Sequence, residues 1–467
     1  MGTDVNNLME KERWFATGFI LASGLLLSVN LWSGSLENHG YLRYAEIARE
    51  MIRSGDWLVP RHNGEIFLNK PPFLFWLIAL PSYFYGSVTP LIARFPSFLA
   101  AWAGAVVVFF WARRVYGATL PGLVAGGVLV STYQYFFQSR LARTDMLFGC
   151  FVLLSLYFFC LGDGPSRFRR SLFIGLSFLS MGLGTLAKGP SGFIVPWVVV
   201  VFELIRKREI RRLASREFGL GYLVFLLTIL PWPLLFINRV GFDQSILLVK
   251  GSQIASRKNP IYYYFVQIWV QYVPWSLFIP YLLYGLWEER KEPSASQRSF
   301  FILWFGTVFI LLTLFQYKAS RYLLPALPAF ALLIGGLWKT KFSYFLIPFI
   351  LSLLAWYSVD LHWMRKDVLY SPGRELVREL KPLVEDASLF GYELDLNTIE
   401  EVNFYLERVI PAIKKPREIA SRLQEEGKTL VLMPKGAYDP ISRRGVLPPV
   451  LTKEFPYKEG SLVLLYR

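Results

Sequence analysis

The residues best suited to acid–base chemistry are two carboxylates and a histidine. Glu37 and His39 open a polar stretch that runs to Pro72 between two long apolar segments, and Asp145 stands at the start of a later apolar segment. A carboxylate or an imidazole at such a position can accept a proton from a hydroxyl group. Each also has a plainer interpretation, because an interfacial Glu or His is often only solvated. An Asp in a first helical turn is favoured by the helix dipole.

A second set of candidates is basic and lies at the ends of apolar segments. Lys70 follows Asn69 and precedes two prolines, which fix the backbone beside it. A lysine held in this way at a membrane face is suited to bind a phosphate group. The other members of the set are Arg140, Arg143, Lys188, Lys318 and Arg321. Single cations at helix ends also reach back to the interface or bind bulk lipid phosphates, so both interpretations stay open.

The polar stretch is predicted to contain a short helix. Its charged residues recur at spacings of three and four and line one face: Arg43, Glu46, Arg49, Glu50 and Arg53. Apolar side chains such as Ile47 and Met51 lie on the other face, which suits a helix in the membrane interface. A solvated surface helix is the alternative. Gly55 is expected to end the helix.

The composition predicts a membrane protein with many spans. Of the 467 residues, 54% are hydrophobic and only 18% are charged, whereas soluble proteins carry about a quarter charged residues. The formal net charge of +16 does not indicate nucleic-acid binding, because most Lys and Arg lie between apolar segments, where they orient the chain. Cys150 and Cys160 lie in one apolar segment, so no disulfide framework is predicted. Lys11, Glu12 and Arg13 precede a long apolar run without a convincing cleavage site.

The apolar segments predict about eleven transmembrane helices within residues 1–359. They are 14–32, 92–111, 120–137, 146–161, 172–186, 193–205, 218–237, 268–287, 300–315, 322–338 and 342–359. If the apolar stretch 73–86 is re-entrant or interfacial, the main basic clusters fall on one side together with the N-terminus. The positive-inside rule makes that side cytoplasmic. The polar stretch and residues 360–467 are then expected outside the cell.

Residues 360–467 are predicted to form a small extracytoplasmic α/β domain. Segments 388–392, 429–433 and 462–466 have the character of strands, and segments 399–406 and 416–426 that of helices. Alternating strands and helices favour an α/β arrangement. No chemical motif is found there, so a capping or partner-docking role is expected.

Several motifs together resemble one family. The order RYAEIAREM, SGDWLVP, NG and NKPP in the first loop, followed by ARTDM, LAKGP and KASRYLLPALP, is similar to the polyprenyl-phosphate-sugar-dependent membrane glycosyltransferases. That superfamily has the GT-C fold and includes the lipid A aminoarabinose transferases and the protein O-mannosyltransferases. The resemblance covers about residues 15–335. One departure concerns an Asp-Glu pair of the family, which Gly40 and Tyr41 replace here.

The resemblance implies roles for individual residues. Asp145 occupies the place of an acidic residue in the second external loop, and Glu37 and His39 lie nearest the missing Asp-Glu pair. Binding of the lipid phosphate and of the substrates is implied for Arg43, Tyr44, Lys70, Arg140, Arg143, Lys188, Tyr263, Lys318, Arg321 and Tyr322. For the tyrosine run that includes Tyr263, an aromatic belt at the membrane interface is the alternative.

The implied activity is that of an inverting glycosyltransferase of the bacterial inner membrane. It would move a sugar from a polyprenyl (undecaprenyl) phosphate to a lipid A-like glycolipid, a glycan or a protein on the outer face. No cofactor is predicted, and His39, His62 and His362 show no metal-ligand spacing, although some relatives carry a divalent metal. A transporter of lipid-linked saccharides and a catalytically impaired relative that binds lipid-linked sugar are the alternatives.

Overall fold

The computed structural model divides the chain into two compact units. It describes residues 2–32, 42–164, 166–245, 258–288, 295–338, 342–369, 372–424, 428–443, 447, 450–458 and 460–466. The helical unit consists of Met1–Trp32, Leu68–Phe84 and Leu91–Asp360, and the sheet unit consists of Ser33–Phe67, Tyr85–Pro90 and Leu361–Arg467. One of the boundaries between the units lies between Asp360 and Leu361. Most of the first polar loop, however, belongs to the same unit as the C-terminal residues.

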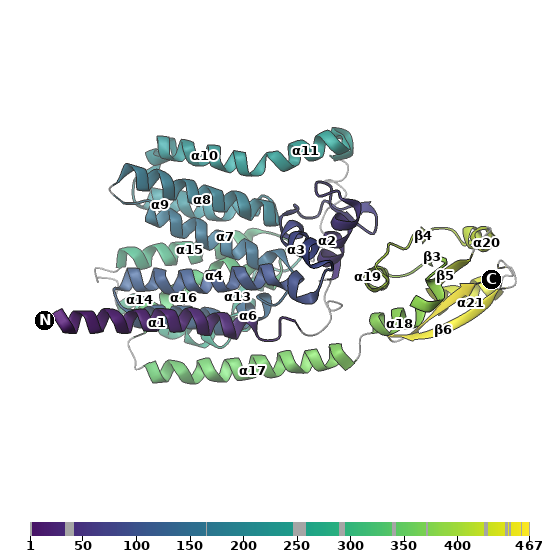
Figure 1. Cartoon of the computed structure of the whole chain (residues 1–467). Helices are drawn as coiled ribbons and strands as arrows, with labels where there is room; N and C mark the ends of the chain where they lie inside the picture. The colour runs from purple at the N-terminus through teal and green to yellow at the C-terminus, as the bar shows by residue number, and fades with distance from the viewer. Residues whose placement is uncertain are drawn as a thin grey trace. The chain divides into compact units, whose positions relative to one another are not determined.

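The helical unit is a bundle of long apolar helices (Figure 1). Its helices are α1 (Gly2–Ser28), α3 (Phe73–Tyr85), α4 (Pro90–Tyr116), α5 (Thr119–Ser131), α6 (Tyr133–Gln138), α7 (Thr144–Leu161), α8 (Arg167–Lys188), α9 (Ser191–Arg206), α10 (Arg216–Ile229), α11 (Pro231–Val240), α13 (Tyr263–Gln271), α14 (Ile279–Glu288), α15 (Ala295–Leu314), α16 (Leu327–Leu337) and α17 (Phe342–Leu369). Short 3₁₀ segments are η2 (Ile210–Ala214), η3 (Trp275–Phe278) and η4 (Ser320–Ala326).

Six helical segments among the described residues are long and apolar enough to cross a membrane. They are Pro90–Tyr116, Thr144–Leu161, Arg167–Lys188, Arg216–Val240, Ser320–Leu337 and Phe342–His362. Two other predicted spans are interrupted: 120–137 breaks between α5 and α6, and 268–287 breaks at η3. Helix α3 has 13 residues and is therefore ~20 Å long, which is short of a ~30 Å hydrocarbon core. The chain is thus a polytopic helical protein, and its full span count stays a prediction.

Small residues let helices α5 and α16 approach closely. A Cβ atom on Gly335 of α16 would lie 2.6 Å from the carbonyl oxygen of Pro121 and 2.8 Å from the Cβ of Ala125, both on α5. No side chain larger than hydrogen fits there. Such close backbone contact is a common source of helix association in membranes, where apolar burial gives little drive.

The sheet unit is built on five strands in the order β4-β3-β5-β7-β6. The strands are β3 (Ser388–Tyr392), β4 (Ala412–Ile413), β5 (Thr429–Pro434), β6 (Leu451–Tyr457) and β7 (Gly460–Tyr466). Strands β4 and β5 pair parallel to β3, whereas β7 pairs antiparallel to both β5 and β6. The helices α18 (Pro372–Val384), α19 (Leu396–Leu406), α20 (Pro416–Gln424) and α21 (Lys435–Arg443) accompany the sheet. The predicted strands 388–392, 429–433 and 462–466 fall within β3, β5 and β7.

The central strand β5 is buried on both faces of the sheet. Leu430 and Leu432 belong to one apolar cluster together with α18 and α19, and Val431 and Met433 belong to a second cluster together with α20 and α21. Because side chains alternate along a strand, the continuous apolar run TLVLMP supplies both clusters.

The sheet unit also contains α2 (Leu42–Ser54) and a hairpin of β1 (Arg61–His62) and β2 (Glu65–Ile66). Asn63 and Gly64 form the hairpin turn with φ angles of 56° and 79°, as a two-residue Asn-Gly turn requires. The predicted helix is present, but its charged face differs from the expectation of a solvated surface. Glu46, Arg49 and Glu50 are only 0%, 9% and 7% exposed. Most of their polar atoms have partners within the unit: Arg49 donates to Glu46 and to the carbonyl oxygens of Asn403 and Phe404, and Glu50 accepts from the amides of Asn63 and Gly64.

The predicted orientation can be tested with single cysteines in a variant that lacks Cys150 and Cys160, which are both free thiols. Cysteines replace the exposed residues Glu65, Ile210 and Arg417. We expect an impermeant maleimide to label positions 65 and 417 in intact spheroplasts, and position 210 only after permeabilisation. The reason is the concentration of Arg and Lys around residues 206–212. Labelling of position 210 in sealed cells, or protection of both other positions, would contradict the orientation.

Candidate active site

Two antiparallel helices bring the carboxylate of Asp145 and the ammonium of Lys188 together at one end of the helical unit. Helices α7 and α8 lie side by side (Figure 1), and the hydroxyl of Ser177 donates to the carbonyl of Ser155 at 2.8 Å. Asp145 precedes Ser155 by ten residues and Lys188 follows Ser177 by eleven. At 1.5 Å per residue both lie ~15–17 Å from this contact in the same direction. The register of the two helices therefore places their side chains at the same level.

The carboxylate of Asp145 and the ammonium of Lys188 form a buried ion pair. Lys188 Nζ donates to Asp145 Oδ1 at 2.6 Å, and the two side chains are 10% and 6% exposed. Asp145 lies in the first turn of α7, where the helix dipole favours a negative charge. Helix α8 ends at Lys188 because Gly189 follows with φ 84° and a proline comes next. The LAKGP segment thus presents Lys188 at a helix end.

Further cations surround the same carboxylate. Arg321 Nε and Arg143 Nε lie 3.6 and 3.9 Å from Asp145 Oδ2. Arg321 comes from η4, so three separate parts of the chain converge on Asp145. Lys188 Nζ also lies 4.6 Å from the ring centroids of both Phe148 and Tyr322, within cation–π range. The predicted residues Arg143, Lys188, Arg321 and Tyr322 are therefore neighbours in space.

Lys70 belongs to this cluster as well. The half-buried ammonium interacts electrostatically with Asp145 and with the three cations around it. Burial, and after it the repulsion from Lys188, lowers the pKa of Lys70 below that of an ordinary lysine. An anion placed beside it would reverse this effect.

The cluster carries a marked excess of positive charge. It combines the four cations Lys70, Arg143, Lys188 and Arg321 with the single carboxylate of Asp145. Like charges at such distances repel one another in a poorly solvated site. A bound anion with several oxygen atoms, such as a phosphate, would relieve that repulsion and accept hydrogen bonds from several of these groups. We call this set the phosphate cluster.

Arg140, which was predicted together with Arg143, takes part in a different contact. Its guanidinium lies 3.6 Å from the ring centroid of Phe136 and donates to the carbonyl oxygen of Leu26 at 3.1 Å. Its Nε lies 3.7 Å from Asp360 Oδ2, and Asp360 accepts a hydrogen bond from Asn30. Arg140 thus connects the turn before α7 to α1 and α17. These contacts give it a packing role, while its predicted role in substrate binding stays untested.

Other predicted residues lie outside the described contacts of the phosphate cluster. Arg43 pairs with Glu400 in the sheet unit, and Tyr44 lies beside it on α2. Lys318 is 6% exposed and donates to the carbonyl oxygens of Asn259 and Phe315. Tyr263 packs against Tyr264 with ring centroids 5.1 Å apart. Glu37 and His39 lie outside the described residues, so their roles stay predictions.

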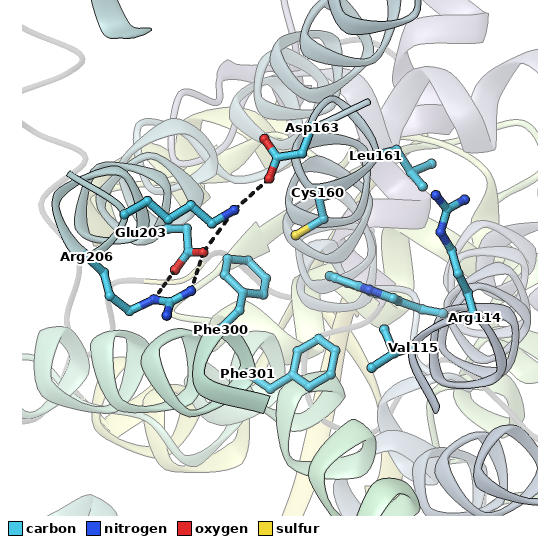
Figure 2. Close-up of a pocket in the computed structure, with 11 residues that line it drawn as sticks. Arg114, Val115, Cys160, Leu161, Asp163, Glu203, Arg206, Phe300 and Phe301 are labelled. Carbon is cyan, nitrogen blue, oxygen red and sulfur yellow. Dashed lines mark hydrogen bonds and ion pairs between the residues drawn. The ribbon is translucent and has the colours of Figure 1, made fainter. Parts of the chain in front are cut away.

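A separate cavity of about 310 Å³ lies at the other end of α7 (Figure 2). Its charged side chains are largely paired with one another. Arg206 donates to both oxygens of Glu203 at 2.7 and 2.8 Å, and Lys207 donates to Asp163 at 2.6 Å. Burial raises the pKa of Asp163, but the hydrogen bonds from Lys207 and Arg212 outweigh it and hold that pKa below its ordinary value. With Arg114 the lining has three cations and two carboxylates, a smaller positive excess than that of the phosphate cluster.

Sequence reasoning missed several polar partners. Asp360, Glu400 and Asn403 were not singled out, since none of them lies in a recognised chemical motif. Their importance becomes visible only in the structure, where each forms a hydrogen bond with a residue hundreds of positions away in the chain. Among the described residues, no group of three His, Cys, Asp or Glu side chains is placed to hold a metal ion.

Comparisons with known proteins point to one class. Residues 69–234, which contain Lys70, Arg143, Asp145 and Lys188, match the family described as dolichyl-phosphate-mannose-protein mannosyltransferase. The bundle is similar to ArnT from Cupriavidus metallidurans in the apo state, with a TM-score of 0.79, 18% sequence identity, and coverage of 96% of this chain and 97% of that chain. The expected resemblance to the GT-C glycosyltransferase superfamily is confirmed, and the fold is ArnT-like.

Two relatives show how far the sequence similarity extends. An uncharacterised protein of Aquifex aeolicus (strain VF5) is 28% identical over 448 residues, which cover 85% of this chain and 86% of that protein. The undecaprenyl phosphate-alpha-4-amino-4-deoxy-L-arabinose arabinosyl transferase of Edwardsiella ictaluri (strain 93-146) is 28% identical over 306 residues. That match covers 63% of this chain and 54% of the enzyme, so this chain spans about half of its length.

The ion pair predicts an asymmetric effect on stability. Asp145→Asn removes the carboxylate that Lys188 and Arg321 approach, whereas Lys188→Met leaves Asp145 with Arg143 and Arg321. We expect Asp145→Asn to lower the free energy of unfolding by ~3–5 kcal/mol, the usual cost of breaking a buried pair, and Lys188→Met to lower it by less. Thermal unfolding of purified protein in detergent measures both. The half-exposed pair Asp163–Lys207 provides the control, and Asp163→Asn should cost only ~0–1 kcal/mol. Equal losses at Asp145 and Asp163 would contradict this account.

Proposed function

We propose that the chain is a glycosyltransferase that moves a sugar from a polyprenyl phosphate, such as undecaprenyl phosphate, to an acceptor at the outer face of the bacterial inner membrane. The observation that carries this proposal is the phosphate cluster at the ends of α7 and α8. A lipid-linked donor reaches a protein from the bilayer, so its phosphate must be bound near a membrane surface. The cluster has four cations and one carboxylate, and this net positive charge suits the binding of a phosphate.

Two comparisons support the choice of donor. The ArnT structure has also been determined bound to undecaprenyl phosphate, and this chain shares its fold with a TM-score of 0.78 at 18% identity. The Edwardsiella relative is named for a sugar carried by undecaprenyl phosphate. We place the lipid phosphate of this chain's donor against Lys70, Lys188, Arg143 and Arg321.

The proposed reaction is a displacement at the sugar's anomeric carbon. An acceptor oxygen forms a bond to that carbon while the bond from carbon to phosphate oxygen breaks, and its electron pair leaves on the phosphate. The configuration inverts because attack and departure occur on opposite faces. Cations already in place stabilise the developing negative charge on the leaving phosphate without reorganising. Lys188, held by Asp145 and two rings, is the most firmly fixed of them.

The proton of an acceptor hydroxyl must go to a base, for which we propose Asp145 first and Glu37 second, with His39 as a third candidate. Asp145 Oδ1 accepts a hydrogen bond from Lys188, and Arg321 Nε and Arg143 Nε lie 3.6 and 3.9 Å from its Oδ2. We assign the proton to this second oxygen, because the first already accepts from Lys188. If the acceptor is itself a phosphate anion, as in a lipid A-like glycolipid, less help from a base is needed. A glycan or protein hydroxyl needs more.

The first test concerns Lys70 and the donor phosphate. We expect Lys70→Ala to weaken undecaprenyl phosphate binding at least tenfold, about 1.4 kcal/mol, because a phosphate contact is lost. Since burial and Lys188 lower the pKa of Lys70, its ammonium loses the proton at a lower pH than an ordinary lysine, and affinity should fall as pH rises through that pKa. Lys70→Arg keeps its charge, so its affinity should persist to higher pH.

Binding is measured by titration of purified protein in detergent between neutral and alkaline pH. Lys381→Ala, at an exposed position of α18, is the matched control and should bind as the parent does. Unchanged affinity in Lys70→Ala would refute the phosphate assignment.

The second test concerns the base. A positioned base contributes roughly 10²–10⁴-fold, so the variant that removes it should lose turnover by that factor while donor binding persists. The variants are Asp145→Asn, Glu37→Gln and His39→Ala, and Glu65→Gln is an exposed control in the same loop. If His39 is the base, the parent's activity should fall below about pH 6.5. Full turnover in all three variants would exclude these side chains as the base. A parent that binds the donor but never transfers the sugar would favour the impaired relative.

A further inference from the structure

A buried polar contact joins the first loop to helix α19 within the sheet unit. The Glu400 side chain is 2% exposed, and its Oε1 accepts from Arg43 Nε at 2.8 Å and lies 3.3 Å from His62 Nε2. Burial raises the pKa of Glu400, but the neighbouring His62 and Arg43 outweigh it and hold that pKa below its ordinary value. Glu400 is therefore charged at neutral pH and attracts the guanidinium of Arg43.

Asn403, one turn further along α19, makes a second set of contacts. Its side-chain amide donates to Asn63 Oδ1 at 2.7 Å, and its side-chain oxygen accepts from the Ile410 amide at 2.9 Å. Its main-chain carbonyl accepts from Arg49 Nη2 at 2.8 Å. Arg49 also donates to the carbonyl oxygen of Phe404 and lies over its ring. A cation at these last carbonyls of α19 is favoured by the helix dipole.

These contacts fix one particular arrangement of the loop. Apolar packing tolerates small shifts, whereas a buried hydrogen bond or ion pair loses its partner when the two surfaces slide. Asn63, which α19 holds from one side, is held from the other by α2. The Glu50 carboxylate accepts from the backbone N–H groups of Asn63 and Gly64 at 2.6 and 3.1 Å. Helix α2 and the hairpin thus form one body together with α19.

The chain leads directly from this body to the phosphate cluster. The Phe67 amide donates to the carbonyl oxygen of Pro60 at 2.8 Å, which closes the base of the hairpin. Lys70 follows Phe67 by only three residues, a reach of at most ~10–11 Å. A hairpin held on α19 gives a fixed starting point to the three residues that lead to Lys70.

We propose that α19 holds α2 and the β1–β2 hairpin in one arrangement and thereby helps to position Lys70. Glu400 and Asn403 are then positioning residues for the phosphate that Lys70 binds. This inference rests on the proposed function only in taking Lys70 as a phosphate ligand. It gives the C-terminal residues a role in substrate binding through α2 and the hairpin, without direct contact with the substrate. Arg43 then acts as a loop residue held by Glu400.

The sharpest variant is Asn63→Gly. Glycine adopts φ 56° without strain, so the hairpin turn is retained while the amide contact with Asn403 is lost. Glu400→Gln is the second variant, because it keeps the shape of the side chain and removes the charge that holds Arg43. Asn397→Ala is the matched control, since Asn397 is an exposed residue on α19 itself.

Two measurements are made on each full-length variant. Hydrogen exchange monitored by mass spectrometry reports whether segments 42–54 and 61–66 loosen relative to β3, β5 and β7. Titration with undecaprenyl phosphate reports the Kd, with Lys70→Ala as the reference for loss of that ligand. We expect Asn63→Gly and Glu400→Gln to exchange faster in the loop segments only and to raise the Kd roughly tenfold. Asn397→Ala should match the parent in both measurements.

The double variant Asn63→Gly/Asn403→Ala adds a specificity check. If the two residues act through one contact, it should raise the Kd no further than Asn403→Ala alone. If hydrogen exchange in segments 42–54 and 61–66 is unchanged in Asn63→Gly and Glu400→Gln, the proposal that α19 holds these segments is wrong. Faster exchange with an unchanged Kd would overturn its role in positioning. Absence of sugar transfer by the parent would count against the proposed function alone, because neither measurement uses turnover.

Discussion

The buried pair of Asp145 and Lys188 is the interaction on which the candidate site depends. Away from water an uncompensated charge is costly, and each of these two residues compensates the charge of the other. The single carboxylate also makes it possible for Arg143 and Arg321 to approach Lys188. Within this cluster of described residues, four cations share the one carboxylate of Asp145, so their combined positive charge exceeds its negative charge. The pair thus holds the cations of the cluster together and leaves a net positive charge, which a bound phosphate would balance.

The two ends of α7 show why charge balance matters more than the number of charged residues. At its C-terminal end, Asp163 and Glu203 are matched by Lys207 and Arg206 around the cavity in Figure 2. Charges paired in this way stabilise the ends of helices and have little left to offer an anion. At the N-terminal end, the cations outnumber the acid. A transporter would need binding groups near the middle of the bilayer, and the described cluster lies at a helix end instead.

Much of the phosphate cluster could be predicted from the sequence because its members occur in short motifs at the ends of apolar segments. ARTDM, LAKGP and KASRYLLPALP each place one or two polar residues where a helix begins or ends. Arg140 shows the limit of this reasoning. It lies three residues before Arg143, yet its guanidinium packs on Phe136 and reaches α1. The direction in which a turn sends each side chain depends on packing partners that adjacent residues do not reveal.

The docking of α2 on α19 was beyond sequence reasoning for a related physical reason. The spacing of Arg43, Glu46 and Arg49 correctly predicts one charged helical face, and an isolated helix would turn that face toward water. Here, Asn403 and Glu400 supply partners from more than 350 residues away, so the same face is buried. A polar helix face that pairs with fixed partners is buried, and its hydrogen bonds and ion pairs fit in one arrangement. The polar residues of the first loop therefore have two roles. Those of α2 and the hairpin contact α19, and Lys70, which follows them, belongs to the phosphate cluster.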